Sequence, residues 1–142
     1  MFEPAPAGAT PGFARETAVD DLRHPDLTRR RTIVVPGAWF DVVEHEPSRS
    51  HVVAAGEIDI ATAPTLRGFL RTGLREVSEG AEVVVDLARV HLLAAAGLHV
   101  LLAAAAIARS RHVALRLHPL SPAVSTILDL TDTRDEFDLE VR

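Results

Sequence analysis

The segment VVVDLARVHLLAAAGLHVLL, residues 83–102, decides the fold of this chain. Its first part is a short run of β-branched apolar residues that ends at Leu87, which is typical of a strand buried on both faces. From Gly97 onward the apolar residues recur at the period of a helix, and the four alanines at 103–106 favour a helix further. The segment therefore predicts a buried strand, a short loop and a helix that begins at residues 94–97, which is half of a βαβ-type unit.

The start of this helix is the first candidate site. Backbone N–H groups at a helix N-terminus have no partner within the helix and attract anions. No hydroxyl group occurs between Val90 and Val100, because Ala94, Ala95 and Ala96 occupy the junction. A phosphate on a serine at this place would be held by the helix N-terminus, but this chain has no side chain there that accepts one.

Outward from this segment, strands and helices alternate. The predicted strands are, in chain order, residues 39–45, 51–55, 82–87, 112–117 and 136–141. The predicted helices are residues 62–80, residues 97–110 and a short one that begins at Ser121. The first two strands are separated by turn residues and form a hairpin. The order β-β-α-β-α-β-α-β predicts an α/β fold, with a mixed β-sheet and helices packed on it.

Residues 1–35 differ from the rest of the chain. They are rich in Pro, Ala and Gly, carry charge blocks at 20–21 and 29–31, and show no lasting apolar period. Such a segment buries too little surface to offset its ordering entropy, so we expect a disordered tail with a strand-like patch at 32–35. The arginines at 29–31 are interpreted as solvated, with a patch for an acidic partner as the alternative. The domain itself is expected at residues 36–142.

Composition excludes several classes of protein. A net charge of −5 does not suggest nucleic-acid binding, and the absence of cysteine excludes disulfides and thiolate metal sites. No signal peptide is recognisable, so the expected location is cytoplasmic. Residues 90–108 lack acids and arginines and nearly have the length of a membrane span, but His91, His99 and the many alanines argue against membrane insertion.

The element order and four strings of residues resemble the STAS domain, named for sulfate transporters and anti-sigma factor antagonists. The strings are GEIDIATAP at 56–64, VVVDL at 83–87, Gly97-Leu98 with the apolar helix that follows, and SPAVSTILDLT at 121–131. The resemblance covers about residues 39–141 and implies the STAS-like mixed sheet. Stand-alone bacterial members of this size act mostly as anti-sigma factor antagonists. The resemblance therefore implies a non-enzymatic regulator that binds an anti-sigma factor, often a serine kinase with a histidine-kinase-like ATPase fold.

The junction departs from the family pattern. Ala94 stands where the family has Asp, Ala95 where it has the phosphoacceptor Ser, and Ala96 where it has Ser, Thr or Ala, while Gly97 matches. Ala95 is thus a degenerate phosphorylation position, and control by a phosphate charge is absent there. One hypothesis is a permanently binding-competent antagonist, which we favour. The alternative is a structural or accessory STAS subunit that binds other STAS proteins in a stressosome-like or transporter-associated assembly.

The residues expected to bind the partner surround this junction. They are Asp59, Thr62, His91, Ala94, Ala95, Ala96, Gly97, Leu98 and His99. Thr62 equally fits a helix cap, and Asp86 is interpreted as ordering the loop after its strand. The seven histidines show no i, i+4 pair, so neither a metal nor another cofactor is expected. No Ser-His-Asp arrangement, glycine-rich phosphate loop or close carboxylate pair points to an enzyme.

Overall fold

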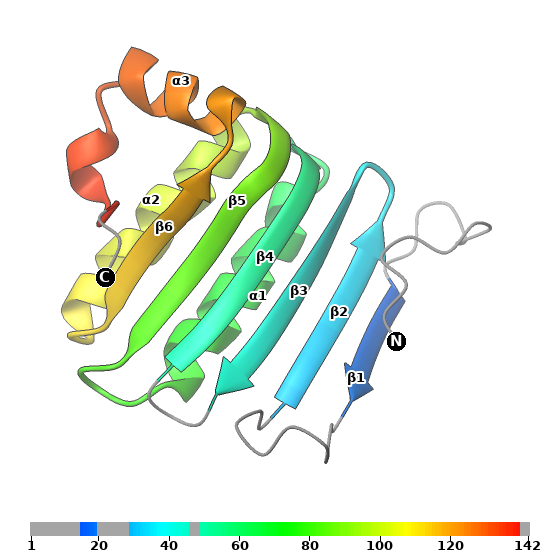
Figure 1. Cartoon of the computed structure of the whole chain (residues 1–142), viewed down its shortest axis with the longest axis vertical. Coiled ribbons are helices and arrows are strands. Elements are labelled where there is room, and N and C mark those ends of the chain that lie inside the picture. The colour runs from blue at the N-terminus through cyan, green and yellow to red at the C-terminus, as the bar shows by residue number, and fades with distance from the viewer. Residues whose placement is uncertain (1–14, 20–28, 46–48, 140–142) are drawn as a thin grey trace.

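The chain folds into one sheet with three helices (Figure 1). The structure is a computed structural model that describes residues 15–19, 29–45 and 49–139. The strands are β1 (Arg15–Val19), β2 (Arg29–Val35), β3 (Ala38–His45), β4 (Arg49–Ile58), β5 (Glu82–Leu93) and β6 (Ala114–Leu120). The helices are α1 (Ala63–Glu76), α2 (Ala95–Ser110) and α3 (Pro122–Leu130), followed by a 3₁₀ turn, η1 (Arg134–Glu136). The predicted α/β mixed sheet is confirmed.

The strands lie in the sheet in the same order as in the chain. The pairs from β1 to β4 are antiparallel, whereas β4 with β5 and β5 with β6 are parallel. A parallel pair requires a crossover, and α1 and α2 supply the two crossovers. Both crossovers advance across the sheet in the same direction, so the same handedness places both helices on one face. Figure 1 shows α1 and α2 together behind the sheet and α3 at its upper end, beside β5 and β6.

The core lies between the sheet and these two helices. Alternate residues of the central strands point into it, and the register places Phe40 opposite Ala54 and Val42 opposite Val52. On α1 and its C-cap, the apolar residues at helical spacing are buried: Leu66, Phe69, Leu70, Leu74 and Val77. Phe40 and Phe69 contact each other with ring centroids 5.9 Å apart, which joins the helix to the sheet.

Two predicted element boundaries are wrong. The strand expected to end at Leu87 continues to Leu93, because β4 extends to Ile58 and supplies backbone partners for this second half. The register between β4 and β5 shifts twice in that region, so β5 bends. The edge strand expected at residues 136–141 is reduced to one parallel bridge between Arg116 and Asp138. Residues 140–142 lie outside the described residues.

The prediction of a disordered tail over residues 1–35 is wrong for two segments, which form β1 and β2. β2 pairs along its whole length with β3, and Thr32 and Val34 are buried there. The Thr32 hydroxyl donates a hydrogen bond of 3.0 Å to the buried Asp41 carboxylate. The strand-like patch expected at residues 32–35 lies within β2, and the pairing with β3 extends this strand back to Arg29. Residues 1–14 and 20–28 lie outside the described residues.

Helix α2 begins in close contact with the end of β4. A Cβ atom on Gly97 would lie 2.6 Å from Ile58 Cγ2, 2.7 Å from Leu93 Cδ1 and 3.1 Å from the Ile58 carbonyl oxygen. Real Cβ atoms do not approach other heavy atoms so closely, so a side chain at this position forces its neighbours to move. Only glycine allows the helix to start this near to the sheet.

Among the described residues, none of the helices combines the length and the apolar character that crossing a bilayer requires.

The hydrogen bond from Thr32 to Asp41 provides a test of the packing of β2. Thr32→Val keeps the shape of the side chain and removes the donor, so a buried carboxylate loses a partner. We expect a loss of about 1–3 kcal/mol in the free energy of unfolding, measured by urea denaturation. The control is Thr126→Val on the exposed face of α3, which we expect to stay within about 0.5 kcal/mol of the wild type. Equal stabilities for the two variants would contradict the position of β2.

Two glycines in helices provide a second, matched test. Gly97→Ala places a methyl group against Ile58 and Leu93, and we expect it to lower the free energy of unfolding by about 1–3 kcal/mol. A Cβ on Gly68 in α1 meets open space, so Gly68→Ala should raise stability by about 0.5–1 kcal/mol through helix propensity alone. Thermal and urea denaturation of both variants measure this. A stabilising Gly97→Ala would disprove the close contact.

Candidate functional site

Two chain segments meet at the upper end of the sheet in Figure 1, where β4 and β5 both end. Ile58 and Leu93 are register partners, and the backbone N–H of Ala94 donates to the Ile58 carbonyl at 2.9 Å. The loop that leads into α1 and the junction that leads into α2 are therefore held side by side. The sequence expectation that residues near 59–62 lie beside the junction agrees with this arrangement.

The loop before α1 is closed by its own side chains. Asp59 accepts hydrogen bonds from the backbone N–H groups of Ala61 and Thr62, at 2.9 and 3.1 Å. The Thr62 hydroxyl donates to the Glu57 carbonyl at 2.7 Å and accepts from the Asp59 N–H at 2.9 Å. Thr62 is only 2% exposed. Asp59 and Thr62 thus hold the shape of the turn, and Thr62 does not reach the surface.

The tip of this closed turn presents Ile60 to solvent. Ile60 is 82% exposed, the highest value among the large apolar side chains that the structure describes as exposed. Leu92, near the end of β5, is 44% exposed because the bend in that strand turns it outward. Sequence reasoning missed both residues. The available signals were an apolar residue inside a turn built from Asp59 and Thr62, and the loss of alternation after Leu87.

The N-terminus of α2 has no side-chain cap. Ala94 occupies the cap position with an extended backbone, φ −83° and ψ 172°, and forms no cap hydrogen bond with its side chain. The first-turn N–H groups and the positive end of the helix dipole therefore face an alanine surface. Ala95 is exposed, and His99 is exposed one turn later on the same side of the helix.

The predicted site residues divide into three groups by exposure. His91, Ala95 and His99 are exposed, and Asp59, Ala94 and Ala96 are half-buried. Thr62, Gly97 and Leu98 are buried and pack beneath the exposed residues of the junction. We call the five exposed residues around the Ala94–Ile58 hydrogen bond the junction surface: Ile60, His91, Leu92, Ala95 and His99.

The junction surface consists of two exposed aliphatic side chains, two exposed histidines and an exposed alanine. Within the described ranges, no group of three or more His, Asp or Glu side chains is placed to hold a metal ion. Asp86 accepts a hydrogen bond from the Ala88 N–H at 2.9 Å, which agrees with the ordering role interpreted from the sequence, although this position lies within β5. Exposed apolar and small side chains together suit binding of another protein surface.

Three solved structures are similar in fold to this chain. An anti-sigma factor antagonist from Mycobacterium paratuberculosis is similar with a TM-score of 0.60 and 25% identity, over 74% of this chain and 86% of that chain. The unphosphorylated form of the antagonist SpoIIAA is similar with a TM-score of 0.55 and 14% identity, over 72% of this chain and 89% of that one. The phosphorylated form of the Bacillus cell fate determinant SpoIIAA gives a TM-score of 0.51 and 14% identity, over 72% and 92%.

No curated protein sequence matches this chain significantly. The family model described as "Mlab, STAS domain" matches residues 42–139, which includes both loops of the junction and all three helices. The match covers more than half of the chain and agrees with the resemblance carried by the four sequence strings. This chain belongs to the STAS domain family.

Proposed function

We propose that this STAS domain is a non-enzymatic anti-sigma factor antagonist that binds its partner through the junction surface without control by phosphorylation. One observation carries the proposal: a chain with the fold of anti-sigma factor antagonists has Ala94, Ala95 and Ala96 at an uncapped helix N-terminus. The fold supports the class of partner, and the three alanines support the loss of the switch.

The exposed apolar side chains support a protein partner. Ile60 and Leu92 lie on two adjacent segments, and the turn of Asp59 and Thr62 holds Ile60 in place. A rigid apolar side chain loses little conformational entropy when a partner covers it, and it gains the full hydrophobic contribution of its exposed area. Such side chains are typical anchors of an interface, with His91 and His99 available at the rim.

Phosphorylation independence follows from the chemistry of the side chains at the junction. A methyl group accepts no phosphoryl group, so the junction surface never acquires the charge of about −1.5 to −2 that a phosphoserine carries. Residues 94–96 therefore never carry a phosphate charge. Control must then act through the amount of the protein or through the partner. We infer that the partner is an anti-sigma factor, with a serine kinase of the histidine-kinase-like ATPase fold as its expected class.

A second function is favoured by the same alanines. A surface that cannot be switched suits a permanent assembly, so an accessory STAS subunit bound to other STAS proteins is the alternative. The two functions differ in what they require. An antagonist competes with a sigma factor for the anti-sigma factor, whereas an accessory subunit forms a stable complex without such competition. A competition assay with the purified sigma factor distinguishes them.

Ile60 provides a direct test of the junction surface. Ile60→Asp places a carboxylate where the partner must remove water, and we expect the affinity for an anti-sigma kinase from the same genome to fall at least about tenfold, measured by calorimetry. Ala95→Glu should act in the same direction for the same reason. The control is Leu130→Asp, because Leu130 is similarly exposed, at 76%, on α3. Equal affinities for Ile60→Asp and Leu130→Asp would exclude the junction surface as the interface.

A phosphate-incorporation assay tests the loss of the switch. With ATP, magnesium and the same kinase, we expect no phosphate on residues 94–97 of the wild-type chain. The double variant Ala94→Asp, Ala95→Ser restores a carboxylate and a hydroxyl at the start of α2, and we expect it to become phosphorylated and then to lose affinity. The single variant Ala96→Ser is the control, since its hydroxyl stands at the wrong position. Phosphate on the wild-type chain at another residue that also weakens binding would overturn phosphorylation independence.

A further inference from the structure

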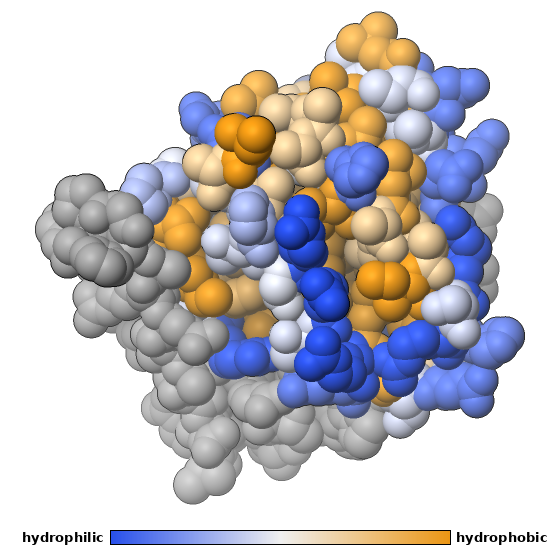
Figure 2. Space-filling view, turned by 180° about the vertical axis from the view of Figure 1, so that it is seen from behind, coloured by the Kyte–Doolittle hydropathy of each residue, from blue (hydrophilic) through white to orange (hydrophobic). Residues whose placement is uncertain are grey.

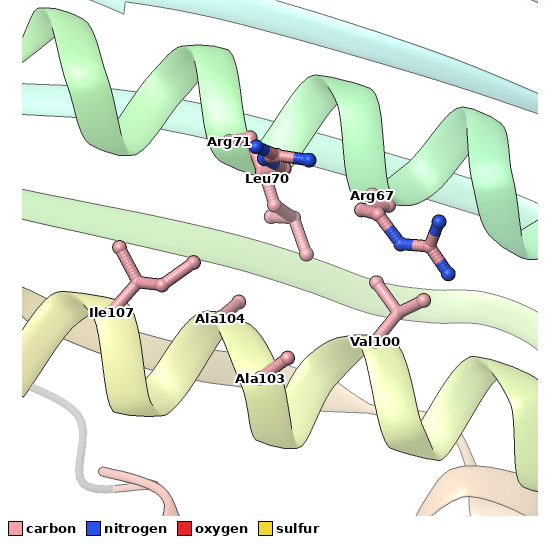
Figure 3. Close-up of a pocket in the computed structure, with 7 residues that line it drawn as sticks. All are labelled: Arg67, Leu70, Arg71, Val100, Ala103, Ala104 and Ile107. Atoms are coloured by element: carbon pink, nitrogen blue, oxygen red, sulfur yellow. The ribbon is translucent and has the colours of Figure 1, made fainter.

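A groove runs between α1 and α2 on the face opposite the exposed side of the sheet (Figure 3). Its floor consists of the buried side chains Leu70, Val100 and Ala104. Arg67 and Arg71 of α1 form one wall, and their aliphatic stems border the apolar floor. The groove floor begins at Val100, directly after His99 of the junction surface, and the groove runs away from that surface along α2 to Ile107.

The other wall of the groove is formed by small and apolar side chains of α2. Ala103 and Ile107 project from α2 toward the groove, and both are exposed. Alanine side chains allow another backbone to approach closely, while Ile107 supplies a larger contact at one end. A wall of this kind fits the apolar side of a helix, which packs by placing its ridge of side chains into such a groove.

The charged wall is a row of three arginines. Arg67, Arg71 and Arg75 follow one another at i, i+4 spacing, so their Cα atoms are about 6 Å apart along one side of α1. All three are exposed, and within the described part of the chain none of them has a hydrogen bond or an ion pair. By contrast, five arginines elsewhere in the described part of the chain form an ion pair with a carboxylate: Arg31, Arg49, Arg109, Arg116 and Arg134.

The positive charge of this face contrasts with the chain as a whole. The residues of α1 and α2 include four arginines and one glutamate, whereas the whole chain has a net charge of −5. Figure 2 shows this face, where a column of hydrophilic residues runs beside hydrophobic ones. The one acidic residue, Glu76, already pairs with Arg31 at 3.9 Å. The groove thus offers an unneutralised positive row parallel to an apolar strip.

We propose that this groove binds an acidic amphipathic helix of a partner protein. The apolar face of the partner helix, made of leucine and alanine, would cover Leu70, Val100 and Ala104. Carboxylates four residues apart on the same helix would pair with the arginine row. The matched spacing arises because both partners have the helical repeat of about 1.5 Å per residue. Arginine suits this role because its planar group binds a carboxylate through two hydrogen bonds.

Other occupants fit the groove less well. A second copy of the chain would bring a second arginine row and no carboxylate among the residues that line the groove, so the positive charge would not be neutralised. A single-stranded nucleic acid would find no aromatic side chain on the floor for base stacking. A lipid bilayer is flat, whereas the apolar residues here line a depression and only Ile107 exposes a large side chain, at 37%.

The test uses a synthetic helix as the probe and the full chain. The probe is a stapled peptide of about 18 residues, with glutamates at three successive i, i+4 positions and leucine and alanine on the adjacent stripe. A peptide of the same composition in scrambled order is the reference. We expect the probe, and not the reference, to shift the amide signals of Leu70, Val100 and Ala104 in NMR titrations, with binding that weakens as salt increases.

Variants separate the charge from the shape of the groove. The double variant Arg67→Glu, Arg71→Glu should weaken the probe about tenfold or more, whereas Arg89→Glu, an exposed arginine placed over Trp39 on the sheet, should leave it unchanged. Ala103→Trp fills the groove with every charge intact and should also abolish binding. Circular dichroism establishes that each variant is folded. Equal affinities for the Arg67/Arg71 and Arg89 variants would overturn the proposal.

Two further outcomes would also overturn it. Equal binding of the scrambled peptide would mean that charge alone is recognised. Binding to phosphatidylglycerol vesicles or to a thymidine oligonucleotide, together with no binding of the probe, would assign the arginine row to a lipid or nucleic-acid surface. The probe contains no anti-sigma factor, so its result is independent of the antagonist proposal.

Discussion

The contact between the start of α2 and the end of β4 is the constraint on which the rest of this structure depends. Gly97 leaves no space for a side chain against Ile58 and Leu93, and the Ala94 N–H binds the Ile58 carbonyl. These two contacts fix where α2 begins and how near it lies to the sheet. The position of α2 then determines which residues form the junction surface and how wide the groove beside α1 is.

The regular part of this fold could be predicted because its signals are local and periodic. The strand around Phe40 and the stripe of Leu66, Leu70 and Leu74 repeat with the periods of the pleat and of the helix, and both are buried. Only the second half of β2 could be predicted in this way, as a strand-like patch at residues 32–35, because the first half consists of three arginines. Its order comes from pairing with β3, which the local pattern does not contain.

The candidate site was predictable in place but not in detail. The strand-to-helix frame located the junction, and Ala95 and His99 are exposed there. The inward position of Thr62 and the outward position of Ile60 depend on hydrogen bonds within one turn. Leu92 faces solvent because the register between β4 and β5 shifts. Residue propensities along one strand do not predict a register shift between two strands.

The agreement between strand order and chain order has a consequence for how this protein forms. Each of the six described strands pairs with its neighbours in sequence, so none of these pairings has to close a loop longer than one crossover. Chains with mainly local pairings reach their native topology quickly, because closing a short loop costs little chain entropy before the stabilising contact forms. On the ribosome, the antiparallel strands that emerge first can pair before α2 has been synthesised. The groove and the junction surface both need α2, so neither exists until the chain has been synthesised as far as Ser110.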